Sequence, residues 1–146
     1  MMAEVLLKKS FEIKGGDFDK AGETSDEIKQ MLKSLEMPPG LIRRTVVITF
    51  EAEMNIVMYA YEGIVTFVLT EDEIKLEISD SGPGIEDINK ALTEGFSTAT
   101  DKMRMMGFGF GMGLPNIRKN SDIFNIESEV GVGTRVSSVI WLNKHA

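Results

Sequence analysis

The sequence predicts an α+β fold in which helices cover one face of a mostly antiparallel sheet. Segments with the pattern of strands occur in pairs, and they do not alternate singly with helices as strands do around a parallel sheet. The chain also has 146 residues, without an internal repeat or a linker-like stretch. This length and continuity predict a single domain over residues 1–146.

The composition excludes several classes of protein. The chain contains no cysteine, which excludes disulfide bonds, thiolate metal sites and a cysteine nucleophile. Its net charge of −7 argues against a nucleic-acid-binding surface. No apolar run approaches the roughly 20 residues of a membrane span, and the N-terminus lacks the pattern of a secretory signal. We therefore expect a cytoplasmic protein that binds neither membranes nor nucleic acid.

The N-terminal part of the chain predicts a strand followed by a helix. Residues 5–13 have the β-branched and aromatic content of a strand, which Gly15 and Gly16 end. Asp17 is placed to cap the next helix, whose apolar residues recur at helical spacing as far as Leu35. The sequence Met-Pro-Pro-Gly at 37–40 then breaks this helix.

A second helix is expected over residues 41–61. Its run Thr-Val-Val-Ile-Thr would suit a strand, but the length of the apolar segment favours a helix buried on most sides. Glu51, Glu53 and Asn55 interrupt this segment. Buried charges are rare unless they are paired or functional, so these side chains are the first indication of a functional site.

The remaining elements alternate between pairs of strands and short helices. Apolar residues alternate with polar ones in the strands, as expected where one face is exposed to water. Pro115 is tolerated in the first turn of a helix. The expected elements are strands at 64–70 and 74–79, a short helix at 85–92, a Gly- and Met-rich loop at 95–113, a helix at 114–120, and strands at 122–130 and 134–142.

Charge is distributed unevenly along this part of the chain. Residues 71–94 contain eight acidic residues against Lys75 and Lys90. Residues 101–119 contain two lysines and two arginines against one acid. An anionic ligand would find cationic surroundings in that second segment. A solvated surface with uneven charge is an equally good interpretation.

The first candidate cluster is Glu51 with Asn55. Residues four apart on a helix point the same way. A carboxylate can accept a proton from a hydroxyl or from water, and an amide oxygen can bind a hard cation such as Mg²⁺. The alternative is a buried polar pair satisfied by its neighbours. Glu53 competes with Glu51 for the role of base, but it lies about 200° further round the helix.

The second cluster is the turn Asp-Ser-Gly-Pro-Gly at 80–84, directly after a strand. Asp80 is an acceptor placed at the end of this strand, where it could bind an exocyclic amine such as that of adenine. The two glycines allow the backbone to approach a flat ligand closely. A plain turn is the alternative, because Asp, Ser, Gly and Pro all favour turns.

The third cluster is Gly-Phe-Gly-Phe-Gly-Met-Gly-Leu at 107–114, which leads into a helix. Alternate glycines expose backbone N–H groups, and the helix N-terminus adds partial positive charge, so the segment suits a phosphate chain. It matches neither the phosphate loop of nucleoside triphosphatases nor the dinucleotide-binding fingerprint. A flexible linker is the alternative, although linkers are usually richer in Ser and Thr.

These features follow one another in a fixed order: the helix with Asn55, the 80–84 turn, the glycine-rich loop, and Gly-Val-Gly-Thr at 131–134. In this order they resemble the ATP-binding domain shared by DNA gyrase, Hsp90, histidine kinases and MutL, over about residues 45–142. The resemblance implies a two-layer α/β sandwich with a mixed sheet, known as the Bergerat fold. It also implies ATP and Mg²⁺ as cofactors.

The same resemblance implies a role for each site residue. Asn55 would bind Mg²⁺, and Asp80 would take the adenine amine. Residues at about 95–112 would form a lid over the nucleotide, in which Lys102 or Arg104 offsets the charge of the transferred phosphoryl group. The other implied nucleotide contacts are Gly82 and Gly84 at the base, Thr134 beside it, and Gly109, Gly111 and Gly113 at the phosphates, followed by Leu114.

Within this superfamily the chain most resembles the bacterial anti-sigma-factor serine/threonine kinases and the related switch kinases. The segments that carry this likeness are 95–99, 109–115 and 126–131. It implies that Glu51 is the general base and that the partner is a small antagonist protein phosphorylated on Ser or Thr. A sigma factor as partner and a homodimer are further implications. Two features depart from the pattern of these kinases. Tyr59 stands where many of them carry His, and the lid sequence is bulkier than usual.

Two other functions fit the same residues. The chain could be a binding module that sequesters a regulatory partner and uses nucleotide only as a switch, with the methionines of the lid as its contact surface. Those methionines fit simple lid packing equally well. Slow ATP hydrolysis, with water in place of the hydroxyl, is the third function.

Overall fold

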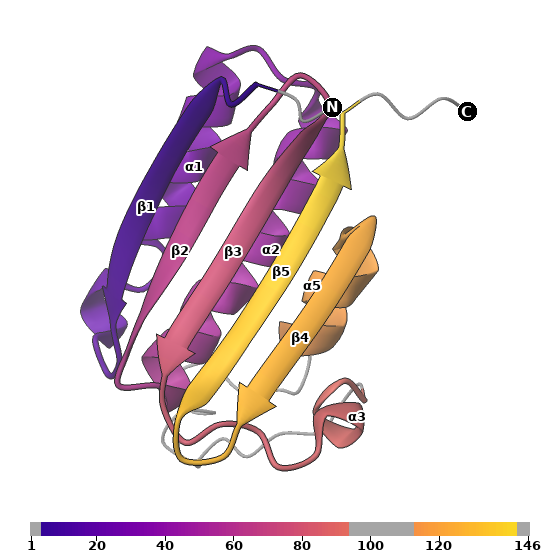
Figure 1. Ribbon diagram of the computed structural model, residues 1–146. Helices are drawn as coiled ribbons and strands as arrows, with labels where there is room; N and C mark the ends of the chain where they lie inside the picture. The colour runs from indigo at the N-terminus through magenta and orange to yellow at the C-terminus, as the bar shows by residue number, and fades with distance from the viewer. Residues whose placement is uncertain (1–3, 94–112, 143–146) are drawn as a thin grey trace.

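The computed structural model describes residues 4–93 and 113–142 of the chain. The elements follow one another in a simple order along the chain (Figure 1). They are β1 (Leu7–Lys14), η1 (Phe18–Lys20), α1 (Glu23–Ser34), α2 (Pro39–Tyr59), β2 (Glu62–Leu69), β3 (Glu73–Ser81), α3 (Ile88–Ala91), α5 (Gly113–Asn120), β4 (Ile123–Glu129) and β5 (Gly133–Trp141).

The strands form one five-stranded sheet in the order β1-β2-β3-β5-β4. Every pairing between the described strands is antiparallel, so the parallel part of the expected mixed sheet is absent from these strands. Helices α1, α2 and α5 lie against the same face of the sheet (Figure 1). The predicted α+β fold with helices on one face is therefore confirmed.

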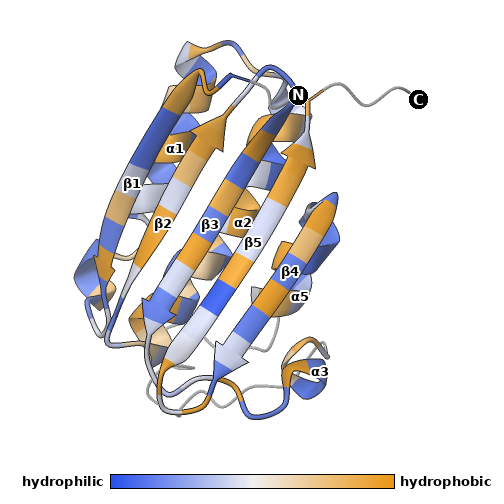
Figure 2. Cartoon of the chain, viewed as in Figure 1, coloured by the Kyte–Doolittle hydropathy of each residue, from blue (hydrophilic) through white to orange (hydrophobic). Residues whose placement is uncertain are grey.

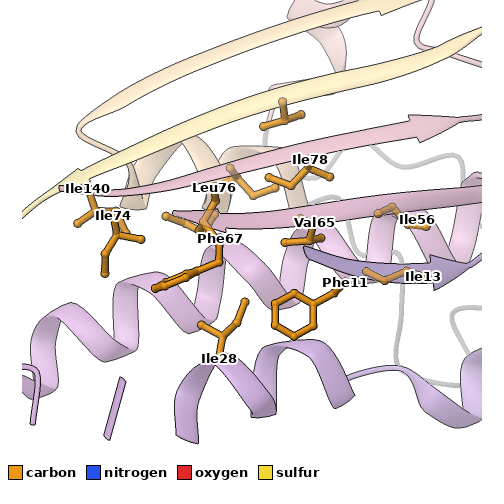
Figure 3. Close-up of a cluster of buried hydrophobic side chains, with 14 of the residues drawn as sticks. Phe11, Ile13, Ile28, Ile56, Val65, Phe67, Ile74, Leu76, Ile78 and Ile140 are labelled. Atoms are coloured by element: carbon orange, nitrogen blue, oxygen red, sulfur yellow. The ribbon is translucent and has the colours of Figure 1, made fainter. Parts of the chain in front are cut away.

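Alternation along the strands places the core between the sheet and the helices. In β3 the apolar residues Ile74, Leu76 and Ile78 are buried, and the polar residues between them face the other side of the sheet. Figure 2 shows this alternation of hydrophobic and hydrophilic residues along β3. From the helix layer, Ile28 of α1 meets Phe67 of β2 and the rest of this cluster (Figure 3). The core thus fixes α1 and α2 against the central strands.

Helix α2 begins at Pro39 and ends at Tyr59, close to the expected bounds. Pro39 is tolerated there because the first-turn N–H groups of a helix have no intrahelical partner. Within the β-branched run, the hydroxyls of Thr45 and Thr49 donate to the carbonyls of Leu41 and Thr45, each over 2.8 Å. Both hydroxyls are therefore satisfied inside the helix, which removes the polar cost of burying them.

Two expected helices are shorter in the structure. Asp17 makes no side-chain cap bond, and the segment after it is a 3-10 turn rather than the start of a long helix. Helix α1 begins only at Glu23, after Gly22. The helix expected at 85–92 is a single turn, α3, which Asp87 caps by accepting from the Lys90 N–H over 3.0 Å.

No helix within residues 4–93 or 113–142 is both long and apolar enough to cross a lipid bilayer.

Candidate functional site

The predicted site residues lie at one end of the sandwich. Asp80 lies near the end of β3, and Thr134 lies near the start of β5 beside it. Asn55 lies in the C-terminal part of α2, and Gly113 begins α5. In Figure 1 this is the end at which β3 and β4 finish and β5 begins. The fold therefore brings segments from three distant parts of the sequence to one end of the molecule.

Asn55 lies directly against the first residue of α5. A Cβ atom placed on Gly113 would lie 2.9 Å from Oδ1 and 3.4 Å from Nδ2 of Asn55. Real side chains do not approach that closely without displacing their neighbour. A glycine at 113 therefore lets the Asn55 amide and the N-terminus of α5 meet, so a polar group is placed beside backbone N–H donors.

The other end of α5 is also tied to α2. The Arg44 guanidinium donates to the carbonyl of Asn120 through Nε (3.0 Å) and a terminal nitrogen (2.7 Å). It also pairs with Asp122 at 3.3 Å. Because Arg44 meets the end of α5 and Asn55 meets its beginning, the two helices run antiparallel. A cation at a helix C-terminus is favourable, so this contact holds α5 in place.

Glu51 lies one turn before Asn55 on the same side of α2. Its side chain is half-buried, and its carboxylate makes no hydrogen bond with any residue that the structure describes. Burial raises the pKa of the Glu51 carboxyl above its ordinary value. A half-buried, unpartnered carboxylate with a raised pKa has the properties of a general base.

Glu53 has a different environment, although it lies only two residues away. It is 2% exposed. Its carboxylate oxygens accept hydrogen bonds from the N–H groups of Gly22 (3.0 Å), Thr24 (3.1 Å) and Ser25 (3.1 Å). These are the free donors at the N-terminus of α1, so Glu53 caps a neighbouring helix. Its carboxylate is thus occupied in a structural contact and is not a competing base.

Asp80 is half-buried and has glycines packed closely on two sides. A Cβ on Gly82 would lie 3.0 Å from Cα of Ala60 and 3.4 Å from Oδ1 of Asp80. Gly133, with a φ of +154°, lies so close that a Cβ would come within 2.0 Å of the Asp80 carbonyl oxygen. Oδ1 accepts from the Thr134 N–H over 3.1 Å. Burial raises the pKa of Asp80, and this hydrogen bond opposes part of the rise.

The 80–84 turn is held by the turn between β4 and β5. The N–H of Gly82 donates to Val132 (3.1 Å), and the N–H of Gly131 donates to Pro83 (2.8 Å). Gly84 packs against the backbone of Glu129, where a Cβ would come within 2.3 Å of its carbonyl oxygen. The observed contact of Gly84 is therefore structural.

Ser128 joins the two turns through its side chain. Its Oγ accepts from the Ile85 N–H over 2.8 Å and lies 2.8 Å from Oγ1 of Thr134. It also donates to the carbonyl of Gly133 over 3.1 Å. Nothing in the sequence distinguishes Ser128, because it lies in an ordinary strand and Ile85 is 43 residues away in the chain. The hydroxyl fixes the segments on either side of Asp80.

The remaining predicted residues have different outcomes. Leu114 is half-buried and packs against the hydrophobic core. The segment 95–112, which was predicted to form a lid with Lys102, Arg104, Gly109 and Gly111, lies outside the described residues. Within residues 4–93 and 113–142, no three His, Cys, Asp or Glu side chains are grouped to hold a metal ion.

The chain is similar in sequence to two kinds of bacterial regulatory protein. The serine/threonine-protein kinase RsbT of Bacillus subtilis is 34% identical over 96 residues, which covers 63% of this chain and 66% of RsbT. An anti-sigma F factor of Caldanaerobacter subterraneus is 34% identical over 101 residues, covering 65% of this chain and 66% of the relative. The matches thus span just under two thirds of these relatives.

A solved structure and a family model extend the comparison to most of the chain. The structure of the SiaB–SiaC complex from Pseudomonas aeruginosa has a TM-score of 0.62 and 14% identity, covering 93% of this chain and 89% of that one. At this identity the likeness shows the fold alone. The model of the histidine kinase-, DNA gyrase B- and HSP90-like ATPases matches residues 41–145. The chain belongs to this ATPase family.

Proposed function

We propose that the chain is a cytoplasmic protein kinase that binds Mg·ATP and phosphorylates Ser or Thr of a small regulatory protein. The observation that carries the proposal is the placement of Glu51 and Asn55 on one side of α2, with Asn55 against the N-terminus of α5. Membership of the ATPase family supports ATP as the nucleotide. The name of RsbT supports a serine/threonine acceptor.

Asp80 would recognise the base. Its Oδ1 is oriented by the Thr134 N–H, which leaves the other carboxylate oxygen to accept from the exocyclic amine of adenine. Gly82 and Gly133 let the backbone pack closely around Asp80, because a Cβ on either would lie 3.0 Å from Cα of Ala60 or 2.0 Å from the Asp80 carbonyl oxygen. A guanine carries a carbonyl in place of that amine, and two acceptors would face each other. The site should therefore prefer ATP to GTP.

Asn55 would hold Mg²⁺ through its side-chain oxygen. Mg²⁺ takes hard oxygen ligands and usually keeps waters and substrate phosphates as most of its ligands, so one protein donor fits its chemistry. When bound, the ion would neutralise charge on the phosphates. The N–H groups at the start of α5 lie beside Asn55 and would stabilise the same anionic groups. Lys102 and Arg104 in the proposed lid would add cationic charge.

Glu51 would accept the proton of the incoming hydroxyl. In the transfer, the Ser or Thr oxygen bonds to the γ-phosphorus and the bond from that phosphorus to the β–γ bridging oxygen breaks. ADP leaves with the electrons of that bond, and the hydroxyl proton passes to Glu51. Since burial raises the pKa of Glu51, its carboxylate is a stronger base than an exposed glutamate.

The acceptor is proposed to be a small antagonist-type protein, which could act in turn on a sigma factor. The name of the anti-sigma F factor relatives supports that class of partner. A homodimer of the kinase is part of the same proposal.

Radiolabelled ATP tests the proposal. The purified chain is incubated with γ-labelled ATP, Mg²⁺ and fractions of bacterial lysate, and labelled proteins are identified by phosphosite mapping. We expect a small protein labelled on Ser or Thr, with no label when Glu51→Gln replaces the wild type. Binding of ATP without label would indicate a nucleotide-dependent binding module. Release of phosphate without any partner would indicate a slow ATPase. Either result would overturn the kinase.

A further inference from the structure

A groove of about 510 Å³ lies between the C-terminal half of α1 and the N-terminal half of α2. Its apolar lining includes Ile42, Val46 and Val47 of α2, all of them partly exposed. Its charged lining consists of Lys29 and Lys33 of α1 and Arg43 of α2. This groove is on the helix layer, and none of its residues belongs to the nucleotide site described above.

The charge of the groove contrasts with that of the chain. The chain carries a net charge of −7, yet the groove lining has three cations and no acid. Within residues 4–93 and 113–142, none of Lys29, Lys33 and Arg43 forms an ion pair. In addition, α2 begins here without an acidic residue in its first turn and without a side-chain cap. The positive end of its macrodipole is therefore also uncompensated.

The position of the groove on α2 relates it to the proposed chemistry. Val47 lies four residues before Glu51, and Glu51 lies four residues before Asn55. Residues at this spacing follow one another along one side of a helix, about 6 Å apart. A protein seated in the groove would therefore reach the turn of α2 that carries Glu51.

We propose that this groove docks an acidic amphipathic helix of the acceptor protein. Apolar side chains of such a helix would cover Ile42, Val46 and Val47, and its carboxylates would pair with the three cations. Helix-in-groove recognition uses this combination of an apolar face and charged edges. The inference rests on the proposed function for the identity of the partner, since the partner is taken to be the phosphorylated protein.

Binding of model peptides tests the groove without any phosphorylation. The probes are two fluorescein-labelled helical peptides of about 20 residues, one with leucines on one face and glutamates on the other, and one with lysines replacing the glutamates. Fluorescence anisotropy is measured with the wild type and with two double variants. Lys33→Glu with Arg43→Glu alters the groove. Lys14→Glu with Lys119→Glu is the matched control, because it makes the same charge change on exposed residues of β1 and α5.

The proposal expects the acidic peptide to bind the wild type and the control variant, and to bind the groove variant about tenfold more weakly. High salt should reduce this difference. Val47→Ser should weaken binding several-fold, with an unchanged melting temperature. Three results would each overturn the proposal. The acidic peptide could lose the same affinity in both double variants, the basic peptide could bind the wild type as well as the acidic one does, or neither peptide could bind the wild type.

A second copy of this acidic chain is the other occupant to consider. Sedimentation equilibrium of the wild type and of the groove variant distinguishes a second copy from the acceptor protein as the occupant. If the wild type is a dimer that Lys33→Glu with Arg43→Glu dissociates, the occupant is a second copy and the acceptor proposal is wrong. Because peptide binding does not need ATP, its failure is distinguishable from failure of the kinase activity.

Discussion

The two faces of α2 carry glutamates in opposite environments. On the face toward α1, Glu53 is 2% exposed and accepts three backbone hydrogen bonds at the start of that helix. On the face toward α5, Glu51 is half-buried and makes no hydrogen bond with a described residue. The same residue type is structural where its acceptors are saturated and available for chemistry where they are not. A buried acid on a helix therefore has to be interpreted from its partners.

The largest difference between substitutions on the two faces is expected in the rate of phosphoryl transfer. Replacing Glu51 with Gln removes the base while keeping the shape of the side chain. We expect the transfer rate to fall by about 100-fold or more, the usual worth of a general base, while ATP binding is retained. Single-turnover labelling of the acceptor measures the rate, and Glu53→Gln is the matched variant on the other face. Transfer at nearly the wild-type rate by Glu51→Gln would exclude Glu51 as the base.

Glu53→Gln should act on stability instead. A glutamine offers one acceptor oxygen and places an NH₂ group against the N–H donors of Gly22, Thr24 or Ser25. Leaving buried donors unsatisfied costs about 1–3 kcal/mol. For a chain of this length that is a fall in melting temperature of about 3–10 °C. Thermal unfolding followed by circular dichroism measures it. A melting temperature equal to that of the wild type would contradict the capping role.

Gly113→Ala tests the contact between the two helices on the nucleotide side. The new Cβ would lie 2.9 Å from Oδ1 of Asn55, so the amide must move. We expect the affinity for Mg·ATP to fall several-fold, about 1 kcal/mol, with little change in affinity for ATP when Mg²⁺ is chelated. Gly40→Ala is a control at a glycine of α2 with no neighbour within 4 Å and without a positive φ. A loss in Gly40→Ala as large as that in Gly113→Ala would contradict the account.

The smallest expected effect is a pH dependence of stability. The pKa of Glu51 is raised above its ordinary 4.5 in the folded chain, so between these two values the folded state binds more protons than the unfolded state. The free energy of unfolding therefore falls as pH rises through that window. Glu51→Gln removes this effect and should raise the melting temperature at pH 7 by on the order of 1–3 °C. Calorimetry of the wild type and of Glu51→Gln at pH 4 and pH 7 checks it. A melting temperature of Glu51→Gln below that of the wild type at pH 7 would contradict it.

Much of the fold could be predicted because the pattern of each element is local. The strand pairs follow from alternation, and α2 follows from an apolar segment too long for a strand. The spacing of Glu51 and Asn55 already placed them on one side of a helix. The expected start of the first helix at Asp17 was wrong. Helix α1 begins at Glu23 and is capped by Glu53, which lies 28 to 31 residues away in sequence from the N–H groups that it binds.

The contacts that complete the site could not be predicted, because they join distant segments. Arg44 binds the carbonyl of Asn120, 76 residues further along the chain. Ser128 fixes Ile85 from a strand that reads as ordinary. Gly113 appeared to be one glycine among several in a loop, and only its approach to Asn55 distinguishes it. The groove between α1 and α2 depends on two helices that the sequence does not place side by side.

Titration calorimetry of Mg·ATP tests the central claim most directly. The claim is that Asn55 and Asp80 hold opposite ends of one nucleotide. We predict that the wild type binds ATP more tightly with Mg²⁺ than with chelator and that Asn55→Ala loses this difference. Asp80→Ala should weaken the binding of ATP both with Mg²⁺ and with chelator, and it should reduce the preference for ATP over GTP. Unchanged Mg·ATP affinity in Asn55→Ala, or unchanged ATP affinity in Asp80→Ala, would contradict the account.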